Sequence, residues 1–300
     1  MKVIQCNEVS KAYKGCHAVN NLSFTIEENS ITGLIGRNGA GKTTLLKLLS
    51  GFMKPTGGEI KVFNENPFNS LKVSANTIFI DEKMCFPKNL TLSEILSSAK
   101  GFYPNFNETM GNRLMEYFSI NKNRKHSELS RGMKSTFNML IGISSHCALT
   151  IMDEPTTGMD ASVRNDFYKI ILRDYVEHPR TMLISSHHLN ELEDILEDIL
   201  LLKSGTKRLH MPLVDLKEYA LGLSGREEAI GVLCKDKKVL YKEGFGKDSM
   251  YVVVETANFQ EDLTVAKNFG VEAKFVSAND LCIYLTSIKE GGIQYVFNEE

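Results

Sequence analysis

The sequence lacks the features of several large classes of protein. No apolar run approaches the ~20 residues that a membrane-spanning helix needs, and the richest one, residues 195–202, is interrupted by Glu197 and Asp198. Residues 1–13 contain no apolar segment typical of a signal peptide, so we expect none. The formal net charge is only −2, and no strongly basic surface is indicated. We therefore expect no nucleic-acid partner and no membrane crossing by this chain itself.

Paired cysteines are also missing. The six cysteines are scattered and none forms a C-x-x-C pair, which argues against a zinc site or a disulfide framework. Free thiols fit a reducing cytoplasm, and we interpret each as a small apolar core residue. The six are Cys6, Cys16, Cys85, Cys147, Cys234 and Cys282.

Strands and helices alternate along most of the chain. Leu22, Phe24 and Ile26 alternate with polar residues, which predicts antiparallel strands near the N-terminus. Alternation of strands with helices is typical of a mostly parallel sheet covered on both faces. The predicted strands lie near 31–35, 59–63, 77–80, 148–152 and 181–185, and the predicted helices near 42–50, 90–117 (interrupted at 101–104), after 130, and over 189–199.

The pattern changes after residue 205. We expect a helix from about Pro212, followed by short strands near 232–240, 251–255 and 281–286. These elements predict a small α+β appendage, and no chemical motif is found in it.

A glycine-rich segment, residues 36–44, carries the clearest chemical signal. It reads G-R-N-G-A-G-K-T-T and fits G-x-x-x-x-G-K-[ST] between a predicted strand and a predicted helix. Glycines let backbone N–H groups surround phosphates closely, and the helix N-terminus favours an anion. In such a loop Lys42 reaches the β- and γ-phosphates and Thr43 ligates Mg²⁺. The strand–loop–helix context disfavours a chance glycine-rich turn.

Two adjacent acids, Asp153 and Glu154, follow the apolar strand predicted at 148–152. Acids at a buried strand end are costly unless they serve a cation or a reaction. Asp153 suits the Mg²⁺ shell, and Glu154 suits polarising an attacking water. The alternative is that they merely cap the turn at Pro155, which the phosphate loop upstream makes less attractive.

The order of these motifs resembles the nucleotide-binding subunit of ABC transporters over about residues 1–210. Residues 128–133, E-L-S-R-G-M, resemble the family signature, usually L-S-G-G-Q, which is peculiar to ABC ATPases. The resemblance implies that Ser130 and Gly132 contact an ATP molecule held by a second ATPase chain. Ser130 is also placed to cap a helix whose positive end would face that anion.

Two departures from the family pattern stand out. The signature has Arg131 and Met133 where glycine and glutamine are usual. The glutamine that the family carries after the strand near 77–80 is missing, and its place falls to Asp81, with Glu82 as the second choice. We expect a working site in which the coupling of nucleotide to membrane channel is altered.

The resemblance assigns the remaining contacts residue by residue. Tyr13 matches the aromatic residue that stacks on adenine, although alone it is equally well a surface tyrosine. Asp160 matches the acid that crosses to the second subunit. His187 matches the histidine at the γ-phosphate, and neighbouring His188 has no such place. The expected set is, for ATP, Tyr13, Asn38, Gly39, Ala40, Gly41, Lys42, Thr43, Thr44, Ser130, Gly132 and Asp160; for catalysis, Lys42, Glu154 and His187; and for Mg²⁺, Thr43, Asp81 and Asp153.

The signature, the acidic residues after 77–80 and the segment F-Y-P-x-F at 102–106 narrow the resemblance. They look like the ABC-2-type exporter ATPases of Gram-positive bacteria, in the bacitracin-resistance, acetoin-operon-linked and antimicrobial-peptide branch. The resemblance implies an α/β P-loop NTPase with a RecA-like core, an antiparallel β subdomain and a helical signature subdomain. We expect this domain over residues 1–210 and the accessory α+β domain over 211–300.

The function that follows is ATP binding and hydrolysis, with Mg²⁺, to power export of a peptide, antimicrobial or amphipathic substrate. The implied partners are an integral-membrane permease and a second ATPase subunit in a homo- or heterodimer, at the cytoplasmic face of the cell membrane. One alternative is a soluble ABC ATPase acting on ribosomes or DNA, which usually has two cassettes or a long coiled coil. A P-loop kinase or GTPase, or a non-hydrolysing subunit, would leave the other motifs or the retained acids unexplained.

Overall fold

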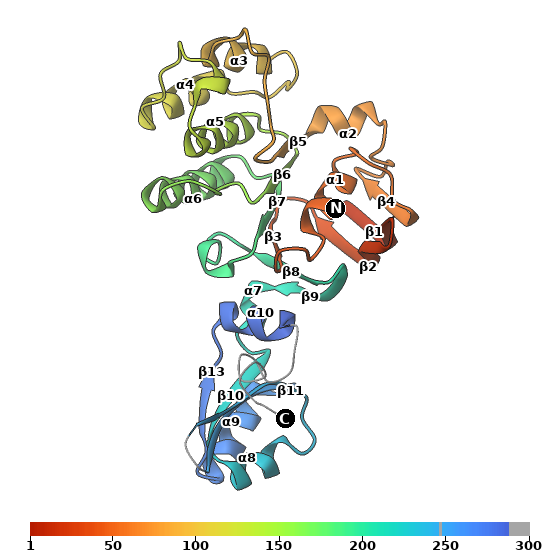
Figure 1. Cartoon of the computed structure of the whole chain (residues 1–300), viewed down its shortest axis with the longest axis vertical. Helices are drawn as coiled ribbons and strands as arrows, with labels where there is room; N and C mark the ends of the chain where they lie inside the picture. The colour runs from red at the N-terminus through yellow and green to blue at the C-terminus, as the bar shows by residue number, and fades with distance from the viewer. Residues whose placement is uncertain (246–247, 288–300) are drawn as a thin grey trace. The chain divides into compact units, whose positions relative to one another are not determined.

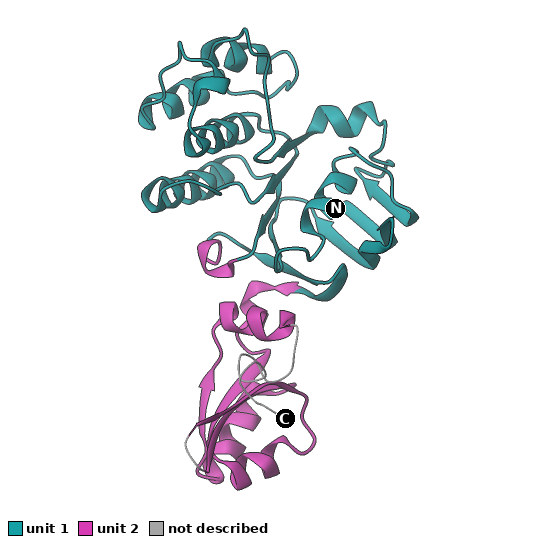
Figure 2. Cartoon of the chain, viewed as in Figure 1, with its two compact units in different colours: residues 1–187, 194–210 teal, residues 188–193, 211–300 magenta. Residues whose placement is uncertain are grey.

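A computed structural model of the chain describes residues 1–245 and 248–287. Its contacts divide the chain into two compact units (Figure 2): residues 1–187 with 194–210, and residues 188–193 with 211–300. The end of the predicted accessory domain, residues 288–300, lies outside the described residues, as do residues 246–247.

The first unit begins with a small antiparallel sheet of order β2-β1-β4. The predicted alternation is confirmed, because Leu22, Phe24 and Ile26 are buried while their neighbours are at least partly exposed. Its strands are β1 (Lys2–Tyr13), β2 (Cys16–Glu27) and β4 (Gly57–Val62).

The second sheet of the first unit has the order β5-β6-β7-β3-β8-β9. The pairs from β5 through β8 are parallel. β3, β6 and β7 are buried along their whole length, as expected for strands covered on both faces. The strands are β3 (Ile31–Ile35), β5 (Thr77–Ile80), β6 (Leu149–Asp153), β7 (Thr181–Ser186), β8 (Asp198–Lys203) and β9 (Thr206–Pro212).

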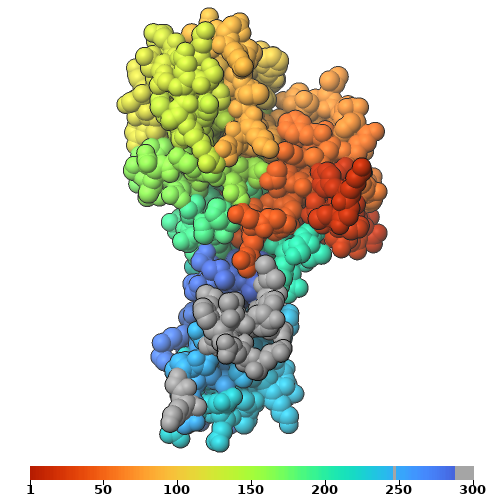
Figure 3. Space-filling view, in the orientation of Figure 1, coloured from red at the N-terminus to blue at the C-terminus, as the bar shows by residue number. Residues whose placement is uncertain are grey.

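Helices flank the parallel sheet. In Figure 1 α5 and α6 lie on one side of it and α1 on the other. The space-filling view shows the segment from α3 to α5, orange-yellow to lime, as one continuous lobe (Figure 3). The helices are α1 (Lys42–Leu49), α2 (Leu71–Asn76), α3 (Leu92–Ala99), α4 (Glu108–Tyr117), α5 (Arg131–Ser144) and α6 (Ala161–Glu177), with a 3₁₀ turn η1 at His126–Glu128.

The helix predicted over 189–199 is wrong. A single 3₁₀ turn, η2 (Leu189–Glu191), replaces it, and the chain then enters β8. Residues 199–202 are four consecutive buried apolar side chains beside β3. Such a run suits a central parallel strand, whereas the helical spacing lies in the residues before it, Leu189, Leu192 and Leu196.

The second unit contains a four-stranded antiparallel sheet of order β11-β12-β10-β13. The chain order β10-α8-β11-β12-α9-β13 is the split βαβ arrangement. Its elements are α7 (Leu213–Leu216), β10 (Ala220–Arg226), α8 (Glu227–Cys234), β11 (Val239–Phe245), β12 (Ser249–Glu255), α9 (Phe259–Asn268), β13 (Glu272–Phe275) and α10 (Ala278–Thr286).

Sequence reasoning located this unit's elements only in part. The strand at 251–255 is confirmed within β12. The strand expected at 281–286 is wrong, because these residues lie in α10, which Ser277 caps by accepting a hydrogen bond from the N–H of Asp280. The first residues of the strand expected at 232–240 belong to α8.

The two units have separate apolar cores. One cluster of buried side chains extends between residues 3 and 202, and a second between 221 and 271. Within the described residues no helix has both the length and the apolar character needed to cross a membrane. The expectation for the cysteines is wrong at two positions, since Cys16 and Cys85 are exposed.

Candidate functional site

The phosphate loop, residues 36–44, connects β3 to α1. Gly39 and Gly41 have φ values of +82° and +99°, a conformation that favours glycine. A Cβ at Gly41 would lie 2.1 Å from the carbonyl oxygen of Ala18, so a side chain is excluded there. Nothing lies within 4 Å of the corresponding position at Gly39. A tightly folded backbone that borders open space is what a phosphate-binding loop requires.

Lys42 is the first residue of α1, and its side chain is only 5% exposed. Its Nζ donates a hydrogen bond of 2.6 Å to the carbonyl oxygen of Gly36. The same Nζ lies 3.1 Å from Oε1 of Glu154. The ammonium group is therefore held inside the loop, with a carboxylate as its anionic partner.

The two acids that follow β6 are held by Ser185 of β7. Ser185 Oγ donates to Asp153 Oδ1 at 2.7 Å, and the N–H of Glu154 donates to the same Oγ at 2.9 Å. Glu154 has φ +45°, an uncommon conformation for a residue with a side chain. Strained backbone of this kind is frequent at functional sites.

His187 follows β7 and faces the same carboxylate. Its Nδ1 lies 3.3 Å from Oε2 of Glu154. The Glu154 carboxylate thus lies between Lys42 and His187, and the structure brings all three expected catalytic residues together. A bound phosphate group would be a more highly charged anion than this carboxylate for Lys42 and His187.

The expected Mg²⁺ ligands lie at the carboxyl ends of neighbouring strands and at the start of α1. Ile80 pairs in parallel with Met152, the last pair of this ladder; Asp81 is the first residue after β5, and Asp153 is the last residue of β6. Thr43 is exposed in the first turn of α1. Hydroxyl and carboxylate oxygens are the ligands that Mg²⁺ prefers, so this donor set fits the ion.

Tyr13 ends β1 opposite Cys16 and is half exposed. Its hydroxyl donates to Met53 Sδ at 3.3 Å. Ala18, which approaches Gly41, lies on the strand paired with that of Tyr13. The tyrosine therefore lies on the strand pair that borders the phosphate loop, with an accessible ring.

The signature residues form the N-terminus of α5. Ser130 caps this helix by accepting a hydrogen bond from the N–H of Met133. Gly132 lies against residue 158, where a Cβ would be 2.6 Å from the carbonyl oxygen of Gly158. Asp160 precedes α6 and is exposed. In the part of the chain that the structure describes, no hydrogen bond or ion pair joins Ser130, Gly132 or Asp160 to the phosphate loop.

Sequence reasoning missed two contacts of this region. Ser185 received no role, although its place at the end of a predicted strand beside the acidic pair could have suggested one. Arg131 and Glu82 form a bidentate ion pair with both N···O distances at 2.8 Å. The sequence marks Arg131 as a departure in the signature and Glu82 only as the second choice for the missing glutamine, and it does not predict their contact.

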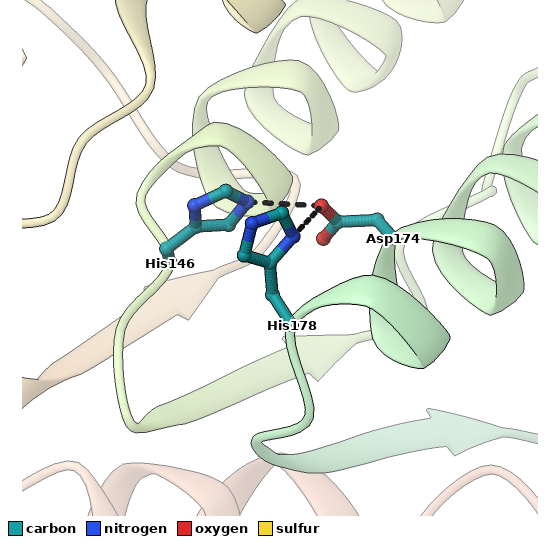
Figure 4. A group of neighbouring side chains, drawn as sticks. All are labelled: His146, Asp174 and His178. Carbon is teal, nitrogen blue, oxygen red and sulfur yellow. Dashed lines mark hydrogen bonds and ion pairs between the residues drawn. The ribbon is translucent and has the colours of Figure 1, made fainter.

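A second polar cluster lies near the other end of β6 and β7 (Figure 4). Oδ1 of buried Asp174 is 2.9 Å from His146 Nε2 and 3.5 Å from His178 Nδ1. Its Oδ2 is 2.7 Å from a guanidinium nitrogen of Arg180, whose side chain is 4% exposed. Because a buried cation already neutralises the carboxylate, this cluster is a structural ion-pair network rather than a cation site.

Comparisons with known proteins show the family. A family model described as "ABC transporter" matches residues 19–157. The ABC transporter ATP-binding protein YtrB of Bacillus subtilis is 32% identical over 216 residues, which cover 72% of this chain and 74% of YtrB. The bacitracin transport ATP-binding protein BcrA of Bacillus licheniformis is 30% identical over 219 residues, 72% of each chain. The chain belongs to the family of ABC transporter ATP-binding proteins.

Solved structures confirm the α/β P-loop fold. An ATP-binding subunit of an ABC transporter superposes with a TM-score of 0.64 at 23% identity, covering 72% of this chain and 92% of its own. The dimeric ABC transporter cassette MJ0796 superposes with a TM-score of 0.62 at 21% identity, covering 70% and 98%. This ABC protein is therefore an ATP-binding, ATP-hydrolysing subunit of a transporter, and it uses ATP with Mg²⁺. Cassettes of the family form dimers and act with membrane permeases.

Proposed function

We propose that this ABC ATPase powers the export of a peptide, antimicrobial or amphipathic substrate through a separate permease. Among its relatives, BcrA is named for bacitracin transport. The Bacillus subtilis protein SkfE, named for SkfA peptide export, is 28% identical over 238 residues, 78% of this chain and 98% of SkfE. These names support a transport role rather than one on ribosomes or DNA.

Nucleotide binding begins on the strand pair that borders the phosphate loop. Tyr13 offers its exposed ring to adenine, and the loop backbone around Gly39 and Gly41 surrounds the phosphates. Asn38, Ala40 and Thr44 complete the loop. Lys42 exchanges the Glu154 carboxylate for phosphate oxygens, which frees Glu154 for its role in hydrolysis.

Export of this kind needs ATP hydrolysis as its source of energy. The observation that supports hydrolysis is the convergence of Lys42, Glu154 and His187 at the carboxyl edge of the parallel sheet. Glu154 accepts a proton from the attacking water or orients it, and His187 steadies the γ-phosphate. Thr43, Asp81 and Asp153 would hold Mg²⁺, and the bound ion would supply positive charge to neutralise the phosphates. Catalysis here is mainly positioning and electrostatic stabilisation.

A second cassette, identical or related, completes each site. Ser130, Gly132 and Asp160 lie at helix starts, and within the described part of the chain none has a hydrogen bond or ion pair with its own phosphate loop, which is consistent with contacts across a dimer. We place the pair at the cytoplasmic face of the cell membrane, bound to the permease.

Deletion of the gene in its native host tests the export proposal. Sensitivity to a panel of bacitracin-like and amphipathic peptides should rise, because the permease loses its motor. Wild-type protein and Lys169→Ala, a change at an exposed lysine of α6, should restore resistance, whereas Lys42→Ala should not. Unchanged sensitivity to every peptide, with ATP hydrolysis intact, would refute export of this substrate class and leave the ATPase assignment standing.

A further inference from the structure

Arg131 of the signature contacts Glu82, the second of the two acids that follow β5. Nε of Arg131 lies 2.8 Å from Oε1 of Glu82, and a terminal nitrogen of the same guanidinium lies 2.8 Å from Oε2. This is the parallel, two-bond geometry that gives arginine–carboxylate pairs their directionality. Glu82 belongs to the segment after β5, and Arg131 directly follows the Ser130 cap of α5.

A second link joins the same two elements deeper in the fold. Nδ2 of buried Asn138, on α5, donates to the carbonyl oxygen of Asp81 at 3.3 Å. Oδ1 of Asn138 lies 2.9 Å from His126 Nε2. Burial, partly offset by this hydrogen bond, lowers the pKa of His126, so its ring is neutral at pH 7. The contact with His126 thereby orients the Asn138 amide toward Asp81.

The start of α5 is also fixed against the segment after β6. Ser135 Oγ donates to the carbonyl oxygen of Thr157 at 2.9 Å. The aliphatic stem of Arg131 passes 3.4–3.5 Å from the position that a Cβ would occupy at Gly158. Arg131 therefore lies where the signature, the segment after β5 and the segment before α6 meet.

These contacts fix the backbone on both sides of Asp81. β5, paired with β6, anchors it upstream, and α5 anchors it downstream through Asn138 and through the Glu82–Arg131 ion pair. A shift of Glu82 would move its neighbour Asp81 away from the proposed Mg²⁺ site. Small displacements of a positioning group are costly in catalysis.

We propose that the Glu82–Arg131 ion pair is a clamp that positions Asp81 for Mg²⁺–ATP, and that Arg131 and Glu82 are positioning residues of this ATPase. The inference rests on the proposed Mg²⁺ role of Asp81. The arginine in the signature and the acid after β5 thus form one unit, in which each residue requires the other.

The clamp is half exposed, with 62% of the Arg131 side chain and 52% of the Glu82 side chain accessible. Such a pair contributes little to the stability of the fold and is screened by salt. Its effect should therefore appear in the Mg²⁺ dependence of hydrolysis, and that dependence should shift more with ionic strength in the wild type than in variants that lack the pair.

The test measures steady-state ATP hydrolysis against Mg²⁺ concentration at low and high salt. Glu82→Gln and Arg131→Gln should each raise the Mg²⁺ concentration for half-maximal rate by about three- to tenfold, with unchanged thermal stability. The double variant should be no worse than either single one, because both remove the same interaction. Glu82→Arg combined with Arg131→Glu should return the Mg²⁺ requirement to within about twofold of wild type.

Arg173→Gln is the matched control, since it removes an exposed arginine–glutamate pair on α6. Independent, multiplying effects of the two single changes would overturn the clamp, as would single variants with the wild-type Mg²⁺ requirement. Failure of the charge exchange to rescue would instead identify Glu82 as a direct Mg²⁺ ligand and would also overturn it. A wild-type protein that hydrolyses no ATP even together with its permease and second cassette would refute the proposed function itself, so the two failures are distinguishable.

Discussion

Among single residues, Glu154 has the most unusual surroundings in the site. Its backbone has a positive φ, and its carboxylate lies between the Lys42 ammonium and the His187 ring. The side chain is 29% exposed, so water can reach it. This placement suits a group that acts on an attacking water once phosphate has taken its place at Lys42.

Glu154→Gln should therefore lower the rate of ATP hydrolysis by about a hundredfold or more, the usual cost of removing a general base. ATP should still bind, and more tightly, because glutamine carries no charge that competes with phosphate for Lys42. Phosphate release and fluorescent-nucleotide binding measure the two effects. Glu177→Gln, at an exposed acid at the end of α6, is the control and should hydrolyse ATP at the wild-type rate. Hydrolysis by Glu154→Gln within about twofold of wild type would exclude the proposed role of Glu154.

Asp174 is the central carboxylate of the structural ion-pair network in Figure 4, as Glu154 is of the nucleotide site. Burial alone would raise the pKa of Asp174, but the hydrogen bond with His146 and the charge of Arg180 lower it below its usual 3.8. The folded state then binds fewer protons than the unfolded chain. This contribution to stability is complete above pH 3.8 and is lost as the pH falls through the lower value of the folded state.

Asp174→Asn should destabilise the fold by about 3–5 kcal/mol at pH 7, because it leaves the buried Arg180 without its counter-ion. Denaturant unfolding measures the change, which should shrink as the pH falls below 3.8. Asp166→Asn, at a partly exposed acid of the same helix that accepts a hydrogen bond from Tyr117, should cost less than about 1 kcal/mol, because asparagine can still accept that bond. Equal losses in the two variants would contradict the ion-pair network.

At the scale of elements, the phosphate loop depends on two glycines in different surroundings. Gly41→Ala should destabilise the fold more than Gly39→Ala and should abolish ATP binding. Both variants pay about 1–2 kcal/mol for a positive φ, but only Gly41 also meets the Ala18 carbonyl. Thermal unfolding and nucleotide binding of the pair measure the difference, and equal stability would contradict the close approach of this loop to β2.

The sequence predicts an element well where one local rule is unambiguous. The phosphate loop combines glycines, lysine and threonine at fixed spacing between a strand and a helix, so its structure and chemistry follow together. Leu22, Phe24 and Ile26 alternate cleanly in an antiparallel strand with one buried face.

Prediction failed where a short apolar run fits two periods. Residues 189–199 have leucines at helical spacing, yet tertiary contacts place 199–202 in a central strand. Residues 281–286 form a helix whose start was signalled by Ser277 and Asp280, a cap that apolar content alone does not reveal. The Glu82–Arg131 pair could not be predicted either, because its members are far apart in sequence.

At the scale of the molecule, the described residues form two units with separate cores. Every residue proposed for ATP, Mg²⁺ or catalysis lies in the first unit, within residues 1–187. We propose that a second cassette completes the site, since among the described residues no hydrogen bond or ion pair joins the signature residues to the phosphate loop. We therefore expect ATP-driven export to depend on a second cassette and a permease more than on the second unit of this chain, residues 188–193 with 211–300.

The most direct test of this dependence is to purify tagged Glu154→Gln protein from its native cell. Membranes are solubilised with ATP and Mg²⁺, so that slow hydrolysis keeps the closed pair together, and bound proteins are identified by mass spectrometry. The same extraction without nucleotide is the control. We predict an integral-membrane permease in the eluate, with any second cassette beside it. Recovery of ribosomal or DNA-repair proteins and no integral-membrane protein would contradict the transport function.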